Sequence, residues 1–260
     1  MRFLFAYAKL YKECLLAALA GTFKNPWTFL LPIVLSLASV FLGVFLSRFG
    51  FLGGILWMLS TNALLSTYLY FMCQIAEGSK TSPKEWKASL GRYFWAILNY
   101  FFIIWLGFLL LEFLFGRLSQ WHAIGLGAQI LCWVAFNAVP ETLYIKGTHG
   151  SMETVRQSFK FIQENWVVWL LPWVPLLGAA WYFVGWQPAI FMQKNWLLGL
   201  LPNVFVYLGS KYFVGLYPFN VYGMAIVLGV FLHLFMAFRG VLFVRLDKST
   251  HRQRMHRFGR

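Results

Sequence analysis

Acidic residues are scarce in this chain. Its 260 residues include only 8 Asp and Glu, and the single Asp, Asp247, lies near the C-terminus. Sites for divalent cations need several oxygen ligands, most of them carboxylates. The shortage therefore argues against membrane enzymes that hold magnesium and pyrophosphate on paired acids. We assign no catalytic residues and predict that the protein is not an enzyme.

Cysteine is rarer still. Cys14, Cys73 and Cys132 each occur alone within an apolar segment, without the C-x-x-C spacing of a zinc site or the density of a disulfide framework. We expect them to be small, buried apolar residues. The sequence predicts no metal site and no cofactor.

Charged residues make up only 12% of the chain, whereas hydrophobic residues make up 60% and aromatic residues 20%. Soluble domains contain about 25% charged residues, so an ordinary water-facing surface cannot be built from this composition. The predicted fold class is all-α: a polytopic membrane protein, with a bilayer as its main solvent.

Six segments reach the roughly 20 residues that a membrane-spanning helix needs. They are predicted at about residues 27–47, 51–75, 93–115, 121–145, 166–185 and 219–244. Residues 186–218 are apolar but broken by prolines and lysines, so re-entrant pieces, interfacial pieces or a seventh span remain open there. The six-helix domain is residues 25–245, preceded by segment 1–24 and followed by a basic tail, residues 246–260.

Three polar stretches are predicted to be amphipathic interfacial helices. In residues 1–24 the charges share one helical face, while apolar residues such as Leu15 and Leu16 can face the other way. After the second span, Ser82-Pro83-Lys84-Glu85 is typical of a capping box with proline at the first helical position. Residues 146–165 carry an apolar stripe opposite a charged one, and the fifth span is expected to begin at Trp166.

The basic residues indicate the orientation. With the N-terminus inside and six spans, four of the 22 Lys and Arg fall on the outer side and the other 18 fall on the cytoplasmic side. The outer residues are Arg48, Arg117, Lys194 and Lys211. Cytoplasmic connections carry the excess of Lys and Arg in membrane proteins, so both termini are predicted to be cytoplasmic.

The string N-x-x-x-x-L-L-P occurs three times, beginning at Asn25, Asn165 and Asn195. The first two copies stand where an interfacial helix is expected to meet a span. Asn can end one helix and start the next, Trp favours the headgroup level, and proline can kink the span. The string therefore predicts a helix boundary at each Asn, although chance matching in so apolar a chain explains it equally well.

A family resemblance rests on residues 139–166. The run Val139-Pro140-Glu141-Thr142-Leu143-Tyr144-Ile145, then Gly147, Ser151 to Lys160 and Asn165-Trp166, resembles the fourth-span exit of YciC-like six-span bacterial proteins. It is also similar to the membrane domain of some glycerophosphodiester phosphodiesterases. The resemblance implies a six-span fold in the bacterial inner (cytoplasmic) membrane. It implies no catalytic residues, because the chain has no phosphodiesterase domain.

A second resemblance is to the permease subunit of ABC exporters of polysaccharide or lipid. It rests on six spans preceded by an interfacial helix, with a cytoplasmic helix between the second and third spans. The long amphipathic connection after the fourth span departs from that pattern. This resemblance implies an ATPase partner docked near residues 82–92.

Polar residues inside spans are costly and usually face the bundle interior. Asn99, Asn137, Glu141 and Arg239 fall in the cytoplasmic third of their predicted spans. We expect a Glu141–Arg239 pair joining the fourth and sixth spans, with Asn99 and Asn137 nearby. Such a cluster is either a contact that holds helices together or a headgroup or ion site that opens to the cytoplasm.

The basic tail is predicted to contact anionic lipid headgroups. The residues assigned to this contact are Arg245, Lys248, Arg252, Arg254, Arg257 and Arg260. No folded nucleic-acid reader accompanies these charges, so we predict no nucleic-acid partner. The expected partners are membrane lipids, with a membrane or cytoplasmic protein as a further candidate, and the oligomeric state is left open.

Two function classes follow. The first is a non-enzymatic inner-membrane protein that acts through lipid or partner binding, in the handling or transport of amphiphiles. The alternative is the permease subunit of an ABC-type lipid or polysaccharide exporter.

Overall fold

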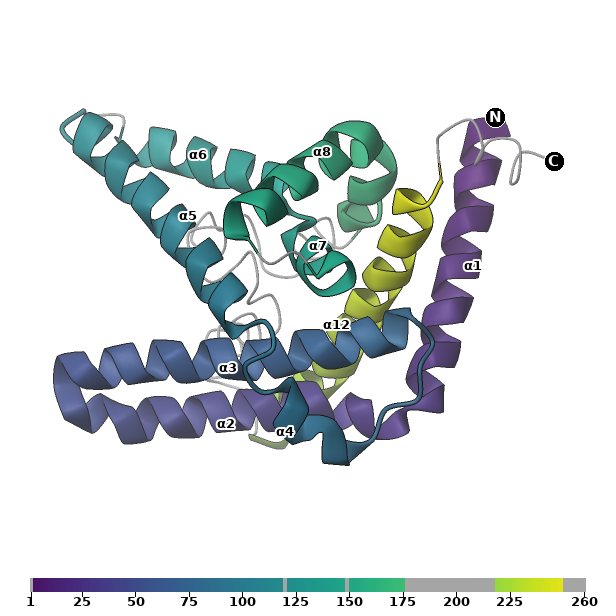
Figure 1. Ribbon diagram of the computed structural model, residues 1–260, viewed down its shortest axis with the longest axis horizontal. Helices are drawn as coiled ribbons and strands as arrows, with labels where there is room; N and C mark the ends of the chain where they lie inside the picture. The colour runs from purple at the N-terminus through teal and green to yellow at the C-terminus, as the bar shows by residue number, and fades with distance from the viewer. Residues whose placement is uncertain (1, 119–120, 148–149, 176–217, 250–260) are drawn as a thin grey trace.

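A computed structural model describes residues 2–118, 121–147, 150–175 and 218–249 (Figure 1). Every regular element in these residues is helical, which confirms the all-α fold class for this part of the chain. Three helical segments are long and apolar enough to cross a membrane: Pro26–Ala76, Phe94–Phe115 and Gly229–Asp247.

The first helix, α1, spans Arg2–Lys24. It ends at Asn25, whose φ of −127° and ψ of 60° are not helical. Pro26 causes this ending, because its ring disfavours the helical conformation of the residue before it. Pro26 then starts the 3-10 helix η1, Pro26–Leu30, which leads into α2, Leu31–Leu46.

Helices α2 and α3 form an antiparallel hairpin, because only three residues connect them. The 3-10 helix η2, Ser47–Phe49, separates α2 from α3, Gly50–Ala76. Gly50 has a φ of +57°, a conformation that glycine adopts without steric cost. The chain therefore reverses at this residue, and α2 and α3 lie side by side (Figure 1).

The predicted capping box after α3 is present. The Ser82 side chain accepts a hydrogen bond from the Lys84 N–H, and the Glu85 carboxylate accepts one from the Ser82 N–H at 3.0 Å. It starts the 3-10 helix η3, Pro83–Glu85, which continues as the four-residue helix α4, Trp86–Ser89. Helix α5, Phe94–Phe115, follows.

The single fourth helix predicted for residues 121–145 is wrong. The chain forms α6, Trp121–Phe136, and a separate helix α7, Val139–Lys146. Pro140 contributes to the break, because it has no N–H to donate to the carbonyl of Phe136. Helix α7 ends at Gly147, which adopts a left-handed conformation.

The predicted boundary at Asn165 is also wrong. Helix α8, Ser151–Leu170, passes through this residue without interruption, and the Asn165 amide donates to the Phe161 carbonyl of the same helix at 3.1 Å. The last helix, α12, is Pro218–Asp247. The third copy of the string and most of the broken segment 186–218 lie outside the described residues.

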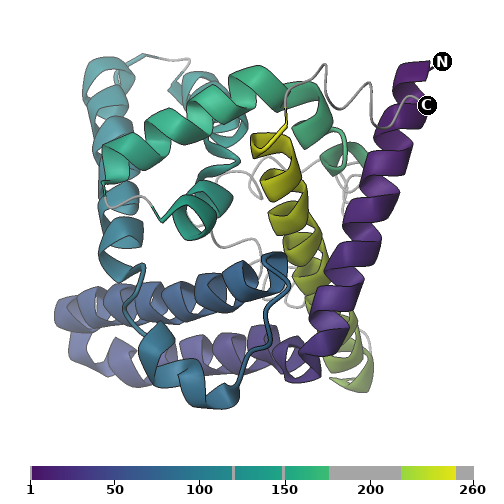
Figure 2. The same cartoon turned by 45° about the vertical axis from the view of Figure 1, so that its right-hand side comes forward.

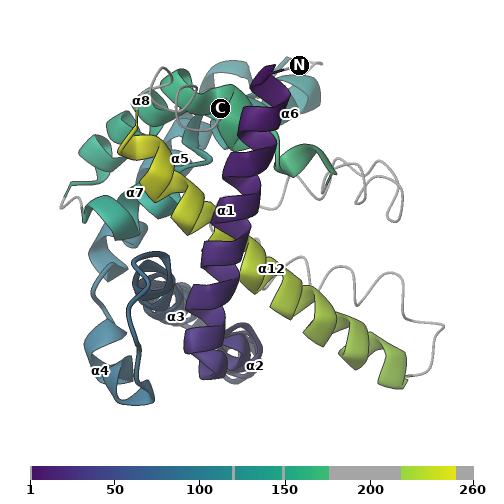
Figure 3. The ribbon, with the colours of Figure 1, turned by 90° about the vertical axis from the view of Figure 1, so that its right-hand side faces the viewer.

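The C-terminal half of helix α12 lies between α1 on one side and α7 and α8 on the other (Figure 2), whereas its N-terminal half projects away from them (Figure 3). Helix α1 crosses α12 (Figure 3) and packs on it through a stripe at four-residue spacing: Ala6, Leu10, Cys14 and Ala18. Leu15 and Leu16, expected on the apolar face, are instead exposed on the outside of α1.

Helix α12 packs closely on α7 and α3 at Gly240. A Cβ atom at this position would lie 2.7 Å from the Tyr144 hydroxyl of α7 and 3.0 Å from Ala76 Cβ of α3. The absence of a side chain at Gly240 therefore lets α12 approach both neighbours.

Candidate functional site

The break between α6 and α7 positions two of the predicted site residues. Asn137 lies in the break, and Glu141 lies in the first turn of α7. Both are buried, with Asn137 3% exposed and Glu141 fully covered. The break therefore directs a backbone carbonyl, an amide side chain and a carboxylate toward the interior.

Arg239 of α12 contacts both Glu141 and Asn137. Its Nε lies 2.8 Å from Glu141 Oε1, and its Nη2 donates to Glu141 Oε2 at 2.9 Å. Nη2 also donates to the Asn137 carbonyl at 2.6 Å. The guanidinium faces both carboxylate oxygens, with a hydrogen bond through Nη2 and a close ion-pair contact through Nε, and such charge-assisted contacts are stronger than neutral hydrogen bonds. The expected Glu141–Arg239 contact is thus present.

Two tryptophans cover the guanidinium. The Arg239 Cζ atom lies 4.9 Å from the ring centre of Trp169 and 5.0 Å from that of Trp173. The indole N–H of Trp169 donates to the Asn137 side chain at 3.0 Å. Cation–π contacts gain strength when water is excluded, so these rings stabilise the charge that burial would otherwise penalise.

Asn99 does not belong to this cluster. It lies on the exposed side of α5, and its side chain has no hydrogen bond to the other three residues. The sequence reasoning also missed Trp169 and Trp173. Their four-residue spacing places them on one side of a helical segment, which is the available signal for an aromatic cover over a buried cation.

The two charged groups of this cluster pair with each other. Glu141 pairs with Arg239, although the 2.8 Å contact between Oε1 and Nε lacks hydrogen-bond geometry, and the Asn137 side chain accepts a hydrogen bond from the Trp169 indole. This arrangement joins α12 to α7 and α8 and presents no open charge. Within the described ranges, no group of three or more His, Cys, Asp or Glu could hold a metal ion.

A second polar contact lies on the same helix, nearer its N-terminus. His233 is fully buried, and its ring nitrogens lie 3.5 Å from the Tyr68 hydroxyl and 3.3 Å from Thr28 Oγ1. The Thr28 hydroxyl itself donates to the Asn25 carbonyl at 2.7 Å. His233 therefore links α12 to α3 and η1 as a hydrogen-bonded histidine of the core.

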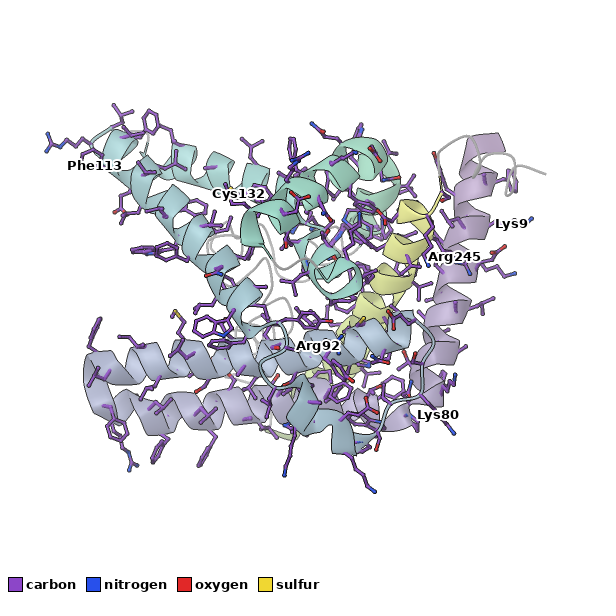
Figure 4. The ribbon with its side chains drawn as sticks, viewed as in Figure 1. Lys9, Lys80, Arg92, Phe113, Cys132 and Arg245 are labelled. Carbon is purple, nitrogen blue, oxygen red and sulfur yellow. The ribbon has the colours of Figure 1, made fainter. Side chains whose placement is uncertain are left out.

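The residues assigned to lipid contact are placed unequally. Arg245 points toward α1 (Figure 4), and its Nη1 lies 2.8 Å from Glu13 Oε2, while Lys248 is exposed. Arg252, Arg254, Arg257 and Arg260 lie outside the described residues. Asp247 pairs with Lys146 of α7 at 2.7 Å, so two ion pairs hold the end of α12.

No family model, curated protein or solved structure matches this chain. The resemblances to YciC-like proteins and to exporter permeases remain predictions from the sequence.

Proposed function

We propose that the protein is a non-enzymatic, multi-pass protein of the bacterial inner membrane that binds lipids or a partner protein and handles amphiphiles at its membrane-facing surface. Six spans with both termini in the cytoplasm complete the proposal, because they leave 18 of the 22 basic residues inside.

The proposal rests on a contrast between the interior, where the charges of Glu141 and Arg239 are paired, and the outer surface, where large apolar side chains are exposed. Glu141 and Arg239 are buried and neutralise one another, so the cluster offers no unpaired charge to a transported solute. An internal transport site needs polar groups that are free to meet a ligand. Binding of an apolar chain at the outer surface needs no such internal polar group.

The outer surface supplies the apolar contacts. Large hydrophobic side chains are exposed along α2, α3 and α5, including Phe41, Phe51 and Phe113, which are 71%, 84% and 84% exposed. The largest apolar patch on a soluble monomer is usually about 300–600 Å². Hydrophobic exposure along three helices fits contact with acyl chains or with a membrane partner.

The test is the lipid and protein content of the particle extracted from its own membrane. The full chain would be purified with its surrounding lipid in polymer nanodiscs, and its lipids compared with those of the bulk membrane by mass spectrometry. We expect enrichment of anionic lipid or of another amphiphile. A bulk-like lipid composition together with an ATPase in stoichiometric amount would favour the exporter permease instead.

The proposed topology has its own test. A reporter active only outside the cytoplasm, fused after Arg117 in the full chain, should be active, whereas the same reporter fused after Lys80 should be silent. Equal reporter activity at both positions would contradict the six-span arrangement.

A further inference from the structure

The connection between α3 and α5 presents a basic surface. Lys80, Lys84, Lys87 and Arg92 are all exposed in this connection. One of its acids is already engaged, because Glu85 accepts hydrogen bonds from the Ser82 N–H at 3.0 Å and from the Tyr70 hydroxyl at 2.9 Å. The loop therefore carries more positive charge than its own residues neutralise.

Arg92 differs from the lysines because its guanidinium lies over two aromatic rings. Its Cζ atom lies 5.3 Å from the ring centre of Tyr70 and 5.8 Å from that of Tyr93, and both tyrosines are 8% exposed. Among the described residues, Arg92 forms no ion pair with a carboxylate. An arginine stacked on rings keeps the N–H groups on its edge available for a phosphate.

The backbone on both sides of Arg92 is anchored to α3. The Ser66 hydroxyl accepts from the Tyr93 N–H at 2.9 Å and donates to the Ser89 carbonyl at 3.3 Å. Gly91, with a φ of +85°, makes the turn between these two anchors. Tyr70 contacts both Glu85 and Arg92. The turn that carries Lys84 and Lys87 therefore lies beside the loop that carries Arg92, with Tyr70 in contact with both.

Apolar side chains flank the same loop. Leu90 is 45% exposed and Trp95 is 69% exposed, two residues before and three residues after Arg92. Exposed Leu and Trp beside cations are typical of segments at the boundary between headgroups and acyl chains. A soluble phosphate compound would leave these side chains in water, whereas a phospholipid covers them.

We propose that Arg92, held against Tyr70 and Tyr93, binds the phosphate of an anionic phospholipid, with Lys84 and Lys87 adding charge and Leu90 and Trp95 contacting the acyl-chain boundary. Figure 4 shows Arg92 and Lys80 at the two ends of this connection. The site deepens the proposed function and rests on it, since it gives lipid binding a defined headgroup contact.

The test uses the full-length protein in detergent, titrated with phosphatidylglycerol or with phosphatidylcholine and followed by native mass spectrometry. We expect the wild type to prefer phosphatidylglycerol. Arg92→Gln should weaken that binding about fivefold, since one cation near a lipid surface contributes about 1 kcal/mol. Arg92→Lys should give an intermediate affinity, because it keeps the charge and loses the stacked planar fork.

Arg48→Gln is the matched control. It removes the same charge from an exposed arginine at the α2–α3 turn, at the opposite end of α3, and should leave lipid binding unchanged. Equal losses in Arg48→Gln and Arg92→Gln, or wild-type affinity in Arg92→Lys, would overturn the proposed site.

The remaining outcomes separate this site from the proposed function. A wild type that prefers phosphatidylglycerol while Arg92→Gln keeps its affinity would overturn the site alone. A wild type without any lipid preference would count against both. Displacement of the lipid by excess inorganic phosphate would make a soluble phosphate the ligand. Loss of a copurifying protein from Arg92→Gln, with lipid binding intact, would assign the loop to a protein partner.

Discussion

Helix α5 and the segment Gly229–Asp247 of α12 are both apolar enough to cross a membrane, yet their surroundings differ. In the most apolar window of each, 67% of the α12 residues are buried inside the protein, compared with 11% for α5. Helix α12 also carries His233, Arg239 and Arg245, each with a polar partner on another helix.

The difference shows where polar residues are tolerated in such a chain. Burial of a charge costs several kcal/mol unless a partner compensates it, and α12 has such partners because helices α1, α3, α7 and α8 surround it. The polar residues Asn99 and Glu112 of α5 are both exposed. Hydropathy alone does not distinguish a central helix from a peripheral one, whereas partnered polar residues do.

The largest loss of stability is expected from Arg239→Leu. The substitution leaves Glu141 buried without its counterion, and breaking such a pair costs about 3–5 kcal/mol. Unfolding of the purified protein in mixed detergent and SDS measures the loss. The double variant Glu141→Leu/Arg239→Leu should recover most of the stability, and Arg48→Leu should match the wild type. A single variant as stable as the wild type would show that the pair does not join α12 to α7.

A pair of leucines compares the two helices directly. Leu242 of α12 is 1% exposed and Leu110 of α5 is 52% exposed. Truncation of a buried leucine leaves a cavity, so Leu242→Ala should lower the free energy of unfolding by at least about 2 kcal/mol. Leu110→Ala should change it by about 0.5 kcal/mol or less. Equal losses in the same SDS titration would mean that α5 is also covered by protein.

Two glycines, one in each helix, should give a smaller difference in stability when each is replaced by alanine. Gly240→Ala places a methyl group against Tyr144 and Ala76, and such overpacking costs about 1–3 kcal/mol. In the part of the chain that the structure describes, nothing beyond the local helix backbone lies within 4 Å of a Cβ added at Gly107 of α5. Gly107→Ala should therefore be neutral or raise stability by up to about 1 kcal/mol, because alanine is the better helix former. Thermal unfolding followed by size-exclusion chromatography would rank the two variants.

The smallest loss of stability is expected from substitutions of the uncharged polar residues. His233→Phe removes the hydrogen bonds to Tyr68 and Thr28, and such contacts between membrane helices contribute about 0.6 kcal/mol on average. Asn99→Leu on α5 should have no cost. If Asn99→Leu destabilises the protein more than His233→Phe does, Asn99 has a partner that the described residues do not include.

The two described copies of the N-x-x-x-x-L-L-P string explain why sequence patterns succeeded in part. At Asn25 the helix ends, and the side chain accepts from the Thr81 N–H at 2.8 Å and donates to the Ser79 carbonyl at 2.9 Å. At Asn165 the helix continues. The local difference is the next residue, since Pro26 disfavours a helical Asn25 and Trp166 does not constrain Asn165.

The Glu141–Arg239 contact could be expected because two lone charges in an apolar chain have few other partners. The α6–α7 break was missed although Pro140 was visible, because a proline can kink a helix or end it and only the neighbours decide between these results. The exposure of Asn99 was missed for another reason. Residues on different helices become neighbours through packing angles, which hydropathy does not encode.

The sequence by itself determined the helical class and the apolar helices, and it predicts the sidedness of the basic residues, because these depend on composition and on residue type along one dimension. Only the tertiary structure decided which apolar helix is central, which polar residues meet and which cations stay available. Those outcomes depend on contacts between residues far apart in the chain, such as Arg239 with Glu141 and Arg245 with Glu13.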